Sequence, residues 1–388
     1  MTDQLPKEQS NQTGLFNGMP QHETFVQMQQ LYNVTTMQPS ANPLNFPEGI
    51  GAALPTNYDF DGRTRNLYSL LGSTYTSALL VLKSGQIEIE EYWLTGNSSA
   101  QWISMSVAKS FVSALVGIAL DEGLIESLED TMERYVPSLQ GTAYAGVQII
   151  DVLQMSSGAR WNEDYSDPES EIFRLSVANS GGSFDEFMKT MMSEREAGTF
   201  CRYNSADTQA LGMLVAGATG HSLTQYMQEK LFQPLGMEHT GYWITDIHGR
   251  EMAYAGLLLT ARDFAKFGEL YRLKGAWQGQ QIVPADYVAA STRASSPHTQ
   301  PNKPFVGDHV FGPGYGYQWW IPEAGNNTFA AIGVYNQFIF VDPDRETVIV
   351  KLSANPAYGT TDLEEDNQDN ENLAALLAIS EHLATQGS

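Results

Sequence analysis

A serine and a lysine three residues apart stand at the head of a long apolar stretch. The stretch WISMSVAKSFVSALVGIAL runs from Trp102 to Leu120 and contains Ser106 and Lys109 near its start. Residues at i and i+3 share one face of a helix, so the lysine amine can reach the serine hydroxyl. A neutral amine could remove the hydroxyl proton while the serine attacks a carbonyl carbon. The pair therefore suggests nucleophilic catalysis.

The same spacing also has a purely structural interpretation. Ser-x-x-Lys is short, so about one chance match is expected in a chain of this length. A lysine on the first turn of a core helix can also simply be solvated. If the helix begins near the serine, its N-terminus adds partial positive charge where an oxyanion would form. The motif by itself leaves both interpretations open.

Two further stretches carry candidates for the same chemistry. AGTFCRYNSADTQALG places Tyr203 and Ser205 before an amphipathic segment, and the strand-like AAIGVYNQFIFVDP contains Gly333. A tyrosine before a helix is most often a packing residue. A strand glycine often marks a bulge, but it also lets a substrate approach the backbone. Cys201, close to Tyr203, is best interpreted as a small buried apolar side chain.

The composition is that of a folded protein with an acidic surface. The chain has 388 residues, of which 42% are hydrophobic and 17% charged, enough for a large core in one or two domains. Its formal net charge is -24, from 45 acidic and 21 basic residues. Such a surface repels phosphate backbones and anionic lipid, so we expect neither nucleic acid nor membrane as a partner. The sequence indicates no oligomeric state.

Signals for targeting and for cofactors are sparse. A single cysteine excludes an intrachain disulfide, and MTDQLPKEQSNQTG at the N-terminus has no apolar run of signal-peptide type. The apolar run 111–120 is about half the length of a membrane span, so we expect a cytoplasmic protein. No His, Cys or Asp cluster has metal-ligand spacing, which predicts no metal and no cofactor. The absence of a Gly-x-Ser-x-Gly elbow argues against a Ser-His-Asp hydrolase.

The coarse pattern predicts strands at both ends of the chain and helices between them. Residues 1–70 are rich in Gln, Asn, Pro and Gly and predict an irregular arm. A β-hairpin is expected around residues 83–85, and helices are expected over 106–123 and in GLLLTARDFAKFGELYRLKG, where TARD resembles an N-terminal cap. The acidic DLEEDNQDNE is interpreted as a solvated connection before a last helix, ENLAALLAISEHLA. This order favours an α+β fold.

The three chemical stretches, in this order, resemble the serine β-lactamase/penicillin-binding-protein family, in which Ser-x-x-Lys is the first motif. VLQMSSGARW and GLLLTARDFAKFG are similar to segments of its class C branch, which includes family VIII carboxylesterases and 6-aminohexanoate-dimer hydrolases. SMSVAKS, WNEDYSDPESE, YGYQWW and NQFIFVDPDRETVIVKLS resemble the aminohexanoate-dimer hydrolases in particular. The resemblance covers roughly residues 75–380. It implies an antiparallel sheet flanked by helices, built from residues 1–105 and 246–388, with a mostly helical subdomain over 106–245.

The resemblance also implies roles for individual residues. Ser106 would be the acylated nucleophile, Lys109 its base, and Tyr203 the relay that carries protons to the leaving group and from the deacylating water. The backbone N–H groups of Ser106 and Val334 would form the oxyanion hole. The implied substrate contacts come from a further set of residues: Tyr165, Ser205, Trp319 or Trp320, Ile332, Gly333 and Tyr335.

Two departures from the family pattern bear on the substrate. Ser205 stands where class C enzymes commonly have an asparagine, and residues 331–333 read Ala-Ile-Gly where Lys-Thr-Gly is usual. The missing lysine and threonine normally hold a carboxylate next to the scissile bond, so β-lactam turnover is disfavoured. An aromatic and aliphatic wall instead suits acyl chains or uncharged linear amides.

We therefore expect a serine hydrolase that cleaves short-chain carboxylic esters through an acyl-enzyme. Three alternatives stay open at this point. They are a linear amide hydrolase of the 6-aminohexanoate-dimer type, a β-lactamase, and a non-catalytic penicillin-recognising binding protein. The expected partner is a small ester or amide substrate.

Overall fold

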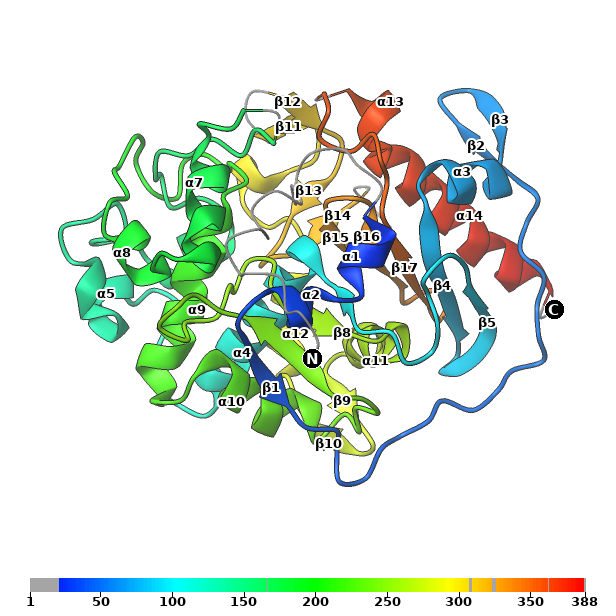
Figure 1. Ribbon diagram of the computed structural model, residues 1–388, viewed down its shortest axis with the longest axis horizontal. Helices are drawn as coiled ribbons and strands as arrows, with labels where there is room; N and C mark the ends of the chain where they lie inside the picture. The colour runs from blue at the N-terminus through cyan, green and yellow to red at the C-terminus, as the bar shows by residue number, and fades with distance from the viewer. Residues whose placement is uncertain (1–20, 166, 307–308, 323–325, 362, 387–388) are drawn as a thin grey trace, which may run out of the picture.

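The fold is organised around a seven-stranded antiparallel sheet whose strands come from both ends of the chain (Figure 1). The computed structural model describes residues 21–386, except for residues 166, 307–308, 323–325 and 362. The strand order is β13-β14-β15-β16-β17-β4-β5. The bounds are β4 Thr76–Lys83, β5 Gln86–Tyr92, β13 Gly314–Tyr315, β14 Trp320–Ile321, β15 Phe329–Gly333, β16 Gln337–Asp342 and β17 Thr347–Ser353.

The predicted hairpin is confirmed as β4 and β5. Ser84 and Gly85 connect the two strands with φ values of 50° and 76°. Left-handed backbone at both central residues is the geometry of the tight turns that match the twist of paired strands. The local sequence was sufficient here because the turn involves only neighbouring residues.

The central strands are apolar on both faces because helices cover both sides of the sheet. Alternate side chains point to opposite faces of a strand. Ile339 and Val348 lie in the core on the side of α11 (Ala261–Arg272), where Gly268 of that helix packs directly against them. Phe338 and Phe340 lie in a second core with residues of α14 (Asp369–Gln386).

The middle of the chain is helical. Figure 1 shows this region on one side of the molecule, with β4, β5 and α14 on the other. α4 is buried almost all round, as expected for a helix whose sequence is apolar on every face. The helices of this middle region are α4 Ala108–Asp121, α5 Met132–Tyr135, α6 Ile149–Leu153, α7 Glu171–Val177, α8 Phe184–Met188, α9 Ser205–Thr219 and α10 Leu223–Met227.

The division into an α/β part over 1–105 and 246–388 and a helical part over 106–245 stays a prediction. A second antiparallel sheet, with the order β1-β7-β8-β6, draws strands from all three ranges. Its strands are β1 Val34–Met37, β6 Trp102–Ile103, β7 Gly241–Ile244 and β8 Leu257–Leu259. After α11 the chain also forms β9 Ala276–Trp277, β10 Gln280–Gln281, α12 Ala285–Ser291, β11 Lys303–Val306, β12 His309–Phe311 and α13 Glu364–Asn367.

The arm predicted to be irregular is only partly so: residues 38–56 lack helix and named strands, but short elements form on both sides of them, and residues 1–20 lie outside the described part of the chain. β1 pairs with β7, with Val34 opposite Ile244. Long-range pairing stabilises this short strand, and no local pattern reports it. The arm contains α1 His22–Phe25, α2 Met28–Leu31, β1, β2 Asn57–Phe60, β3 Arg63–Asn66 and α3 Leu67–Ser73.

The acidic run DLEEDNQDNE is not the solvated connection that its charge predicts. Within its described residues, α13 forms and α14 begins, and both Asp369 and Glu371 are buried. Glu371 accepts hydrogen bonds from the Tyr58 hydroxyl at 2.6 Å and from Arg65 at 2.8 Å. Both partners belong to the N-terminal arm, so the sequence near Glu371 holds no signal for its burial.

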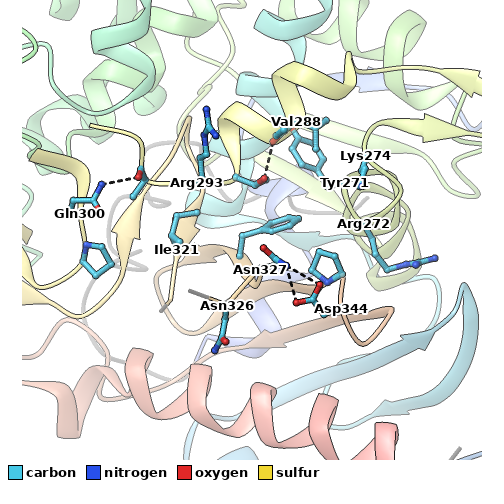
Figure 2. Close-up of a pocket in the computed structure, with 16 residues that line it drawn as sticks. Tyr271, Arg272, Lys274, Val288, Arg293, Gln300, Ile321, Asn326, Asn327 and Asp344 are labelled. Carbon is cyan, nitrogen blue, oxygen red and sulfur yellow. Dashed lines mark hydrogen bonds between the residues drawn. The ribbon is translucent and has the colours of Figure 1, made fainter. Parts of the chain in front are cut away.

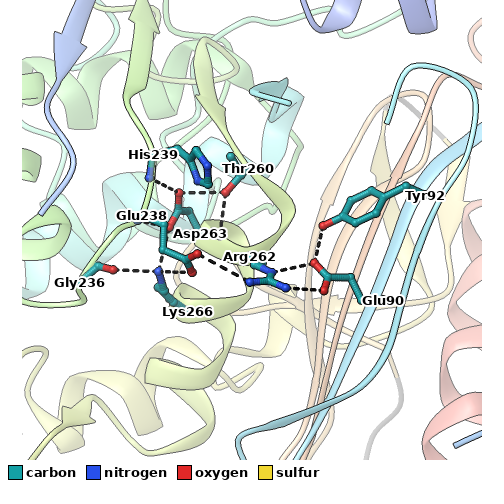
Figure 3. A network of polar contacts seen from close by, with 9 residues as sticks. All are labelled: Glu90, Tyr92, Gly236, Glu238, His239, Thr260, Arg262, Asp263 and Lys266. Atoms are coloured by element: carbon teal, nitrogen blue, oxygen red, sulfur yellow. Dashed lines mark hydrogen bonds and ion pairs between the residues drawn. The ribbon is translucent and has the colours of Figure 1, made fainter. Parts of the chain in front are cut away.

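A buried ion-pair network anchors α11 (Figure 3). Thr260 caps the helix by accepting a hydrogen bond from the backbone N–H of Asp263, which confirms the predicted cap. The Lys266 amine is fully buried and contacts Asp263 at 3.1 Å, Glu238 at 2.9 Å and the Gly236 carbonyl at 2.8 Å.

Arg262 extends this network to the large sheet. Its guanidinium group makes a bidentate pair with Glu90 of β5, with distances of 2.7 and 2.6 Å. Figure 3 shows Arg262 between Glu90 and the carboxylates around Lys266. A paired charge can be buried where an isolated one is costly, so this network fixes α11 against its neighbours.

Candidate active site

Ser106 sits on a tight turn between the second sheet and the central helix. It belongs to the 3-10 turn Met105–Val107, which connects β6 to α4. Met105 has a φ of 47°, a conformation that a side chain of this size rarely adopts and that surrounding packing must hold in place. Ser106 is 8% exposed, so its hydroxyl lies at the edge of a buried environment.

Gly333 at the end of β15 allows the sheet to approach this turn. A Cβ atom at position 333 would lie 2.8 Å from the Ser104 carbonyl oxygen and 3.0 Å from the Ser106 nitrogen. Only glycine permits so close an approach without moving the backbone. Val334 follows Gly333 in the chain, and the pairing of the Ser106 and Val334 N–H groups as an oxyanion hole stays a prediction.

The Lys109 side chain is enclosed in the protein and points at the Ser106 hydroxyl. The residue is 1% exposed, and its amine lies 2.9 Å from Ser106 Oγ, 3.1 Å from Ser205 Oγ and 2.9 Å from the Tyr254 carbonyl oxygen. Among the described residues, no carboxylate lies within ion-pair distance of the amine. Burial lowers the pKa of Lys109 to about 7, and the negative charge of Glu163 partly opposes that shift.

Tyr203 is the third candidate catalytic residue of the cluster. Its phenol lies near the Ser106 side chain, and the Lys109 amine is 5.1 Å from the centre of its ring. Burial raises the pKa of Tyr203 well above its usual value, the Glu163 charge raises it further, and the contact with Ser106 opposes both. Tyr203 therefore keeps its proton at neutral pH and is suited to donate it.

The start of α9 positions Tyr203 and Ser205. Asn204, between them, caps the helix by accepting a hydrogen bond from the Ala206 N–H at 2.8 Å. The cap fixes the backbone on which Tyr203 and Ser205 stand, so the two side chains reach Ser106 and Lys109 from a rigid element. This accounts for the Tyr-Asn-Ser order found in the sequence.

Glu163 is part of the cluster and was missed by the sequence analysis. It is 3% exposed and accepts hydrogen bonds from Ser205 Oγ at 2.6 Å, the Ser205 N–H at 3.0 Å and the Tyr165 hydroxyl at 2.8 Å, and another from Trp161 Nε1. In the sequence it is one of several acidic residues in WNEDYSDPESE, a pattern typical of a solvated loop. The flanking Trp161 and Tyr165 were the only local signal of its burial.

The predicted pocket residues divide into two groups. Tyr165 contacts Glu163, and the indole of Trp320 stacks on the Tyr203 ring with 5.2 Å between ring centres. Ile332 belongs to the same apolar cluster as Tyr203 and Trp320. The first two side chains contact residues of the candidate site, and the role of all three as substrate contacts stays a prediction.

Trp319 lies in the core, and Tyr335 is buried beside Tyr358. Trp319 is fully buried in the core, where it packs against Phe267 and Tyr271 of α11. The prediction that it lines the pocket is wrong for this reason: adjacent residues of an extended segment point to opposite sides, and Trp320 takes the side of the site. Tyr335 is 1% exposed and packs against Phe25 and Tyr358, and its contact with the substrate stays a prediction.

A separate cavity of about 590 Å³ lies on another part of the molecule (Figure 2). Figure 2 shows Arg293 and Gln300 on one side of it and Arg272 and Lys274 on the other. None of the candidate catalytic residues lines this cavity. In the described part of the chain, no group of three or more His, Cys, Asp or Glu residues could hold a metal ion. No helix among the same residues is long and apolar enough to cross a membrane.

Comparison with known proteins establishes the class to which this site belongs. Residues 69–374 match the family model described as Beta-lactamase, so the chain belongs to the β-lactamase family. It is 30% identical over 302 residues to the 6-aminohexanoate-dimer hydrolase of Paenarthrobacter ureafaciens, with 76% of each chain covered. The predicted family resemblance is confirmed, and the protein is a serine hydrolase of this family.

Solved structures confirm the predicted α+β fold. A structure from Bacillus anthracis, provisionally assigned as a 6-aminohexanoate-dimer hydrolase, has a TM-score of 0.82 at 24% identity, and the match covers 94% of both chains. The structure of a family VIII carboxylesterase has a TM-score of 0.59 at 16% identity, covering 79% of this chain and 92% of that one.

Proposed function

We propose that the protein hydrolyses short-chain carboxylic esters through an acyl-enzyme on Ser106. The observation that carries the proposal is the buried Lys109 amine at 2.9 Å from Ser106 Oγ, with its pKa lowered to about 7. A base is most effective when its pKa lies near the working pH, because it is then largely deprotonated and still accepts a proton readily. An ordinary lysine, with a pKa near 10.4, would be almost fully charged at neutral pH.

The proposed acylation step uses these residues. As Ser106 Oγ attacks the carbonyl carbon, its proton moves to the neutral Lys109 amine and the carbonyl electron pair moves to oxygen. The N–H groups of Ser106 and Val334 stabilise that oxygen. Collapse of the intermediate breaks the bond to the leaving group, and the Tyr203 hydroxyl protonates it. Lys109 then returns its proton to Tyr203. In deacylation, water attacks the acyl carbonyl carbon while Tyr203 takes a proton from the water and passes its own to Lys109. The bond to Ser106 Oγ then breaks, and Lys109 gives its proton back to the serine.

Esters are proposed as the substrate class because of the chemistry and the lining of the site. An alkoxide leaves more easily than an amide nitrogen, which must be protonated, so this apparatus cleaves esters with the lower barrier. Ala331 and Ile332 are both buried and apolar, and no cation stands at these two positions to hold a substrate carboxylate. The surrounding Tyr165, Trp320 and Ile332 suit an uncharged acyl chain.

A linear amide of the 6-aminohexanoate-dimer type is the second candidate substrate. The 30% identity to a 6-aminohexanoate-dimer hydrolase over 76% of the chain favours it. The relay through Tyr203 also supplies the proton that an amine leaving group requires. Ester and amide hydrolysis would use the same residues, so the two candidates differ in relative rate and not in mechanism.

One substrate panel tests the proposal. Wild type and Ser106→Ala are assayed side by side on p-nitrophenyl acetate, butyrate and hexanoate, on the linear 6-aminohexanoate dimer, and on the β-lactam nitrocefin. We expect ester hydrolysis that is lost in Ser106→Ala, with nitrocefin cleaved far more slowly. Fast nitrocefin cleavage without esterase activity would overturn the substrate assignment.

Two other outcomes would overturn the mechanism itself. Near wild-type ester hydrolysis by Ser106→Ala would exclude Ser106 as the nucleophile. No turnover of any substrate by wild type, together with no labelling of Ser106 by a fluorophosphonate probe, would favour the non-catalytic binding protein.

A further inference from the structure

The Glu163 carboxylate is buried against the candidate base without contacting it. Among the described residues, no lysine or arginine lies within ion-pair distance of this carboxylate. Its hydrogen-bond donors are instead neutral: the Ser205 hydroxyl and N–H, the Tyr165 hydroxyl and the Trp161 indole. A buried carboxylate held only by neutral donors is costly to maintain. A cost of this kind suggests that the buried carboxylate has a function.

Ser205 links Glu163 to Lys109. The Ser205 hydroxyl lies 2.6 Å from Glu163 Oε1 and 3.1 Å from Lys109 Nζ. A hydroxyl has a single proton, and the carboxylate, which can only accept, takes it. The Ser205 oxygen therefore presents only lone pairs to the lysine amine.

The direction of the Ser205 hydrogen bond also determines which side of the Lys109 amine faces Ser106. A neutral amine has two N–H groups and one lone pair. The Tyr254 carbonyl can only accept, so it takes one N–H, and Ser205, held as an acceptor, takes the other. The remaining position on Lys109 is the lone pair, and the remaining neighbour is Ser106 Oγ at 2.9 Å. The amine is then oriented to receive the Ser106 proton.

We propose that Glu163 is a positioning residue that acts through Ser205 to direct the lone pair of Lys109 at the Ser106 hydroxyl. This inference rests on the proposed function, because it assigns how the proposed base is oriented. Glu163 exchanges no proton in the cycle. Without its charge, the Ser205 hydroxyl is free to donate to the Lys109 lone pair and so block the base.

Glu163 has a second, separable effect through its charge. Burial lowers the pKa of Lys109, and the negative charge of Glu163 raises it again in part. Loss of that charge should therefore lower the pKa of Lys109 further. The two effects can be measured separately. Loss of the Lys109 orientation should lower kcat, whereas loss of the Glu163 charge should change the pH at which Lys109 becomes neutral.

Glu163→Gln tests both effects on p-nitrophenyl butyrate. The amide has the same shape as the carboxylate but no charge, and it can donate where the carboxylate could not. Because an oriented general base contributes about 10²- to 10⁴-fold, we expect kcat to fall by about 10- to 100-fold with little change in KM. The acid limb of kcat/KM should move to lower pH.

Ser205→Ala separates the two effects. It removes the link but leaves the charge, so kcat should fall while the acid limb moves less than in Glu163→Gln. In the double variant the losses should not add, because both single changes break the same relay. Glu371→Gln is the matched control: this buried carboxylate also accepts hydrogen bonds but lies with Tyr58 and Arg65, so kcat and the acid limb should not change.

The outcomes distinguish this inference from the function on which it rests. If Ser106→Ala is inactive while Glu163→Gln keeps wild-type kcat and pH profile, the positioning role is wrong and the nucleophile stands. If Ser106→Ala remains active, the proposed function itself fails. If Glu163→Gln does not fold, as judged by circular dichroism, Ser205→Ala decides: full activity of that variant would overturn the relay.

Discussion

Two lysines are buried equally deeply in this protein, but the groups around their amines differ. Lys266 meets two carboxylates, Glu238 at 2.9 Å and Asp263 at 3.1 Å (Figure 3). Lys109 meets only hydroxyl and carbonyl oxygens. A buried ammonium with carboxylate partners is held in its charged form, whereas one without them loses its proton more easily. The first arrangement builds structure, and the second provides a base.

A third buried lysine shows that a lowered pKa is not sufficient. Lys351 lies 2.6 Å from Ser353 Oγ and 3.0 Å from Thr74 Oγ1, and burial lowers its pKa to about 7, opposed in part by Asp369. Ser353 is fully buried, however, while Ser106 is 8% exposed and faces the close approach of Gly333. A serine–lysine pair can act on a substrate only where a carbonyl group can reach the oxygen.

The largest expected difference between the first two regions is in activity. Lys109→Met removes the proposed base while keeping an apolar side chain of similar length in the buried site. We expect the rate on p-nitrophenyl butyrate to fall by about 10³-fold or more, because the serine proton has no acceptor. Thermal unfolding should change by only a few degrees. Activity close to that of wild type would exclude Lys109 as the base.

Lys266→Met should produce the opposite result. It leaves Asp263 buried without its cation and Glu238 with only Arg262, 3.8 Å away, and breaking one side of a buried ion pair typically costs about 3–5 kcal/mol. We expect that loss in urea unfolding, with the activity per folded molecule retained. If Lys266→Met instead lost activity without losing stability, the contrast between the two lysines would be wrong.

The pH dependence of wild type sharpens the comparison further. Lys109 must be neutral to accept a proton, and its pKa is lowered to about 7. The value of kcat/KM should fall about tenfold per pH unit below pH 7 and reach a plateau above it. A limb near pH 10, where an ordinary lysine titrates, would mean that the active-site lysine is not desolvated in solution.

The smallest effect is expected at Lys351. Its folded pKa lies below that of the unfolded chain, so the unfolded state binds more protons between about pH 7 and 10, and stability rises with pH in that window. One such group contributes at most about 1.4 kcal/mol per pH unit. Lys351→Met should therefore gain less stability than wild type between pH 8.5 and 9.5 in urea unfolding. An unchanged slope would show that Lys351 stays charged when buried.

The sequence determined the features that depend on neighbours along the chain. The Ser84-Gly85 turn, the Thr260 cap and the spacing of Ser106 and Lys109 all follow from a few adjacent residues, and each was predicted. The family and the α+β fold were also predictable, because several motifs occur in a fixed order. In each case the information lies within one short segment or in the order of such segments.

Only the tertiary structure decided the environment of those residues. Glu163 stands among acidic residues in the sequence, yet its partner Ser205 is 42 residues away and buries it. Trp319 and Trp320 are identical in type and adjacent, and packing alone sends one to the core and the other to Tyr203. The proton affinity of Lys109 likewise depends on what surrounds its amine. Desolvation and long-range hydrogen bonds are properties of the folded neighbourhood, and no local pattern encodes them.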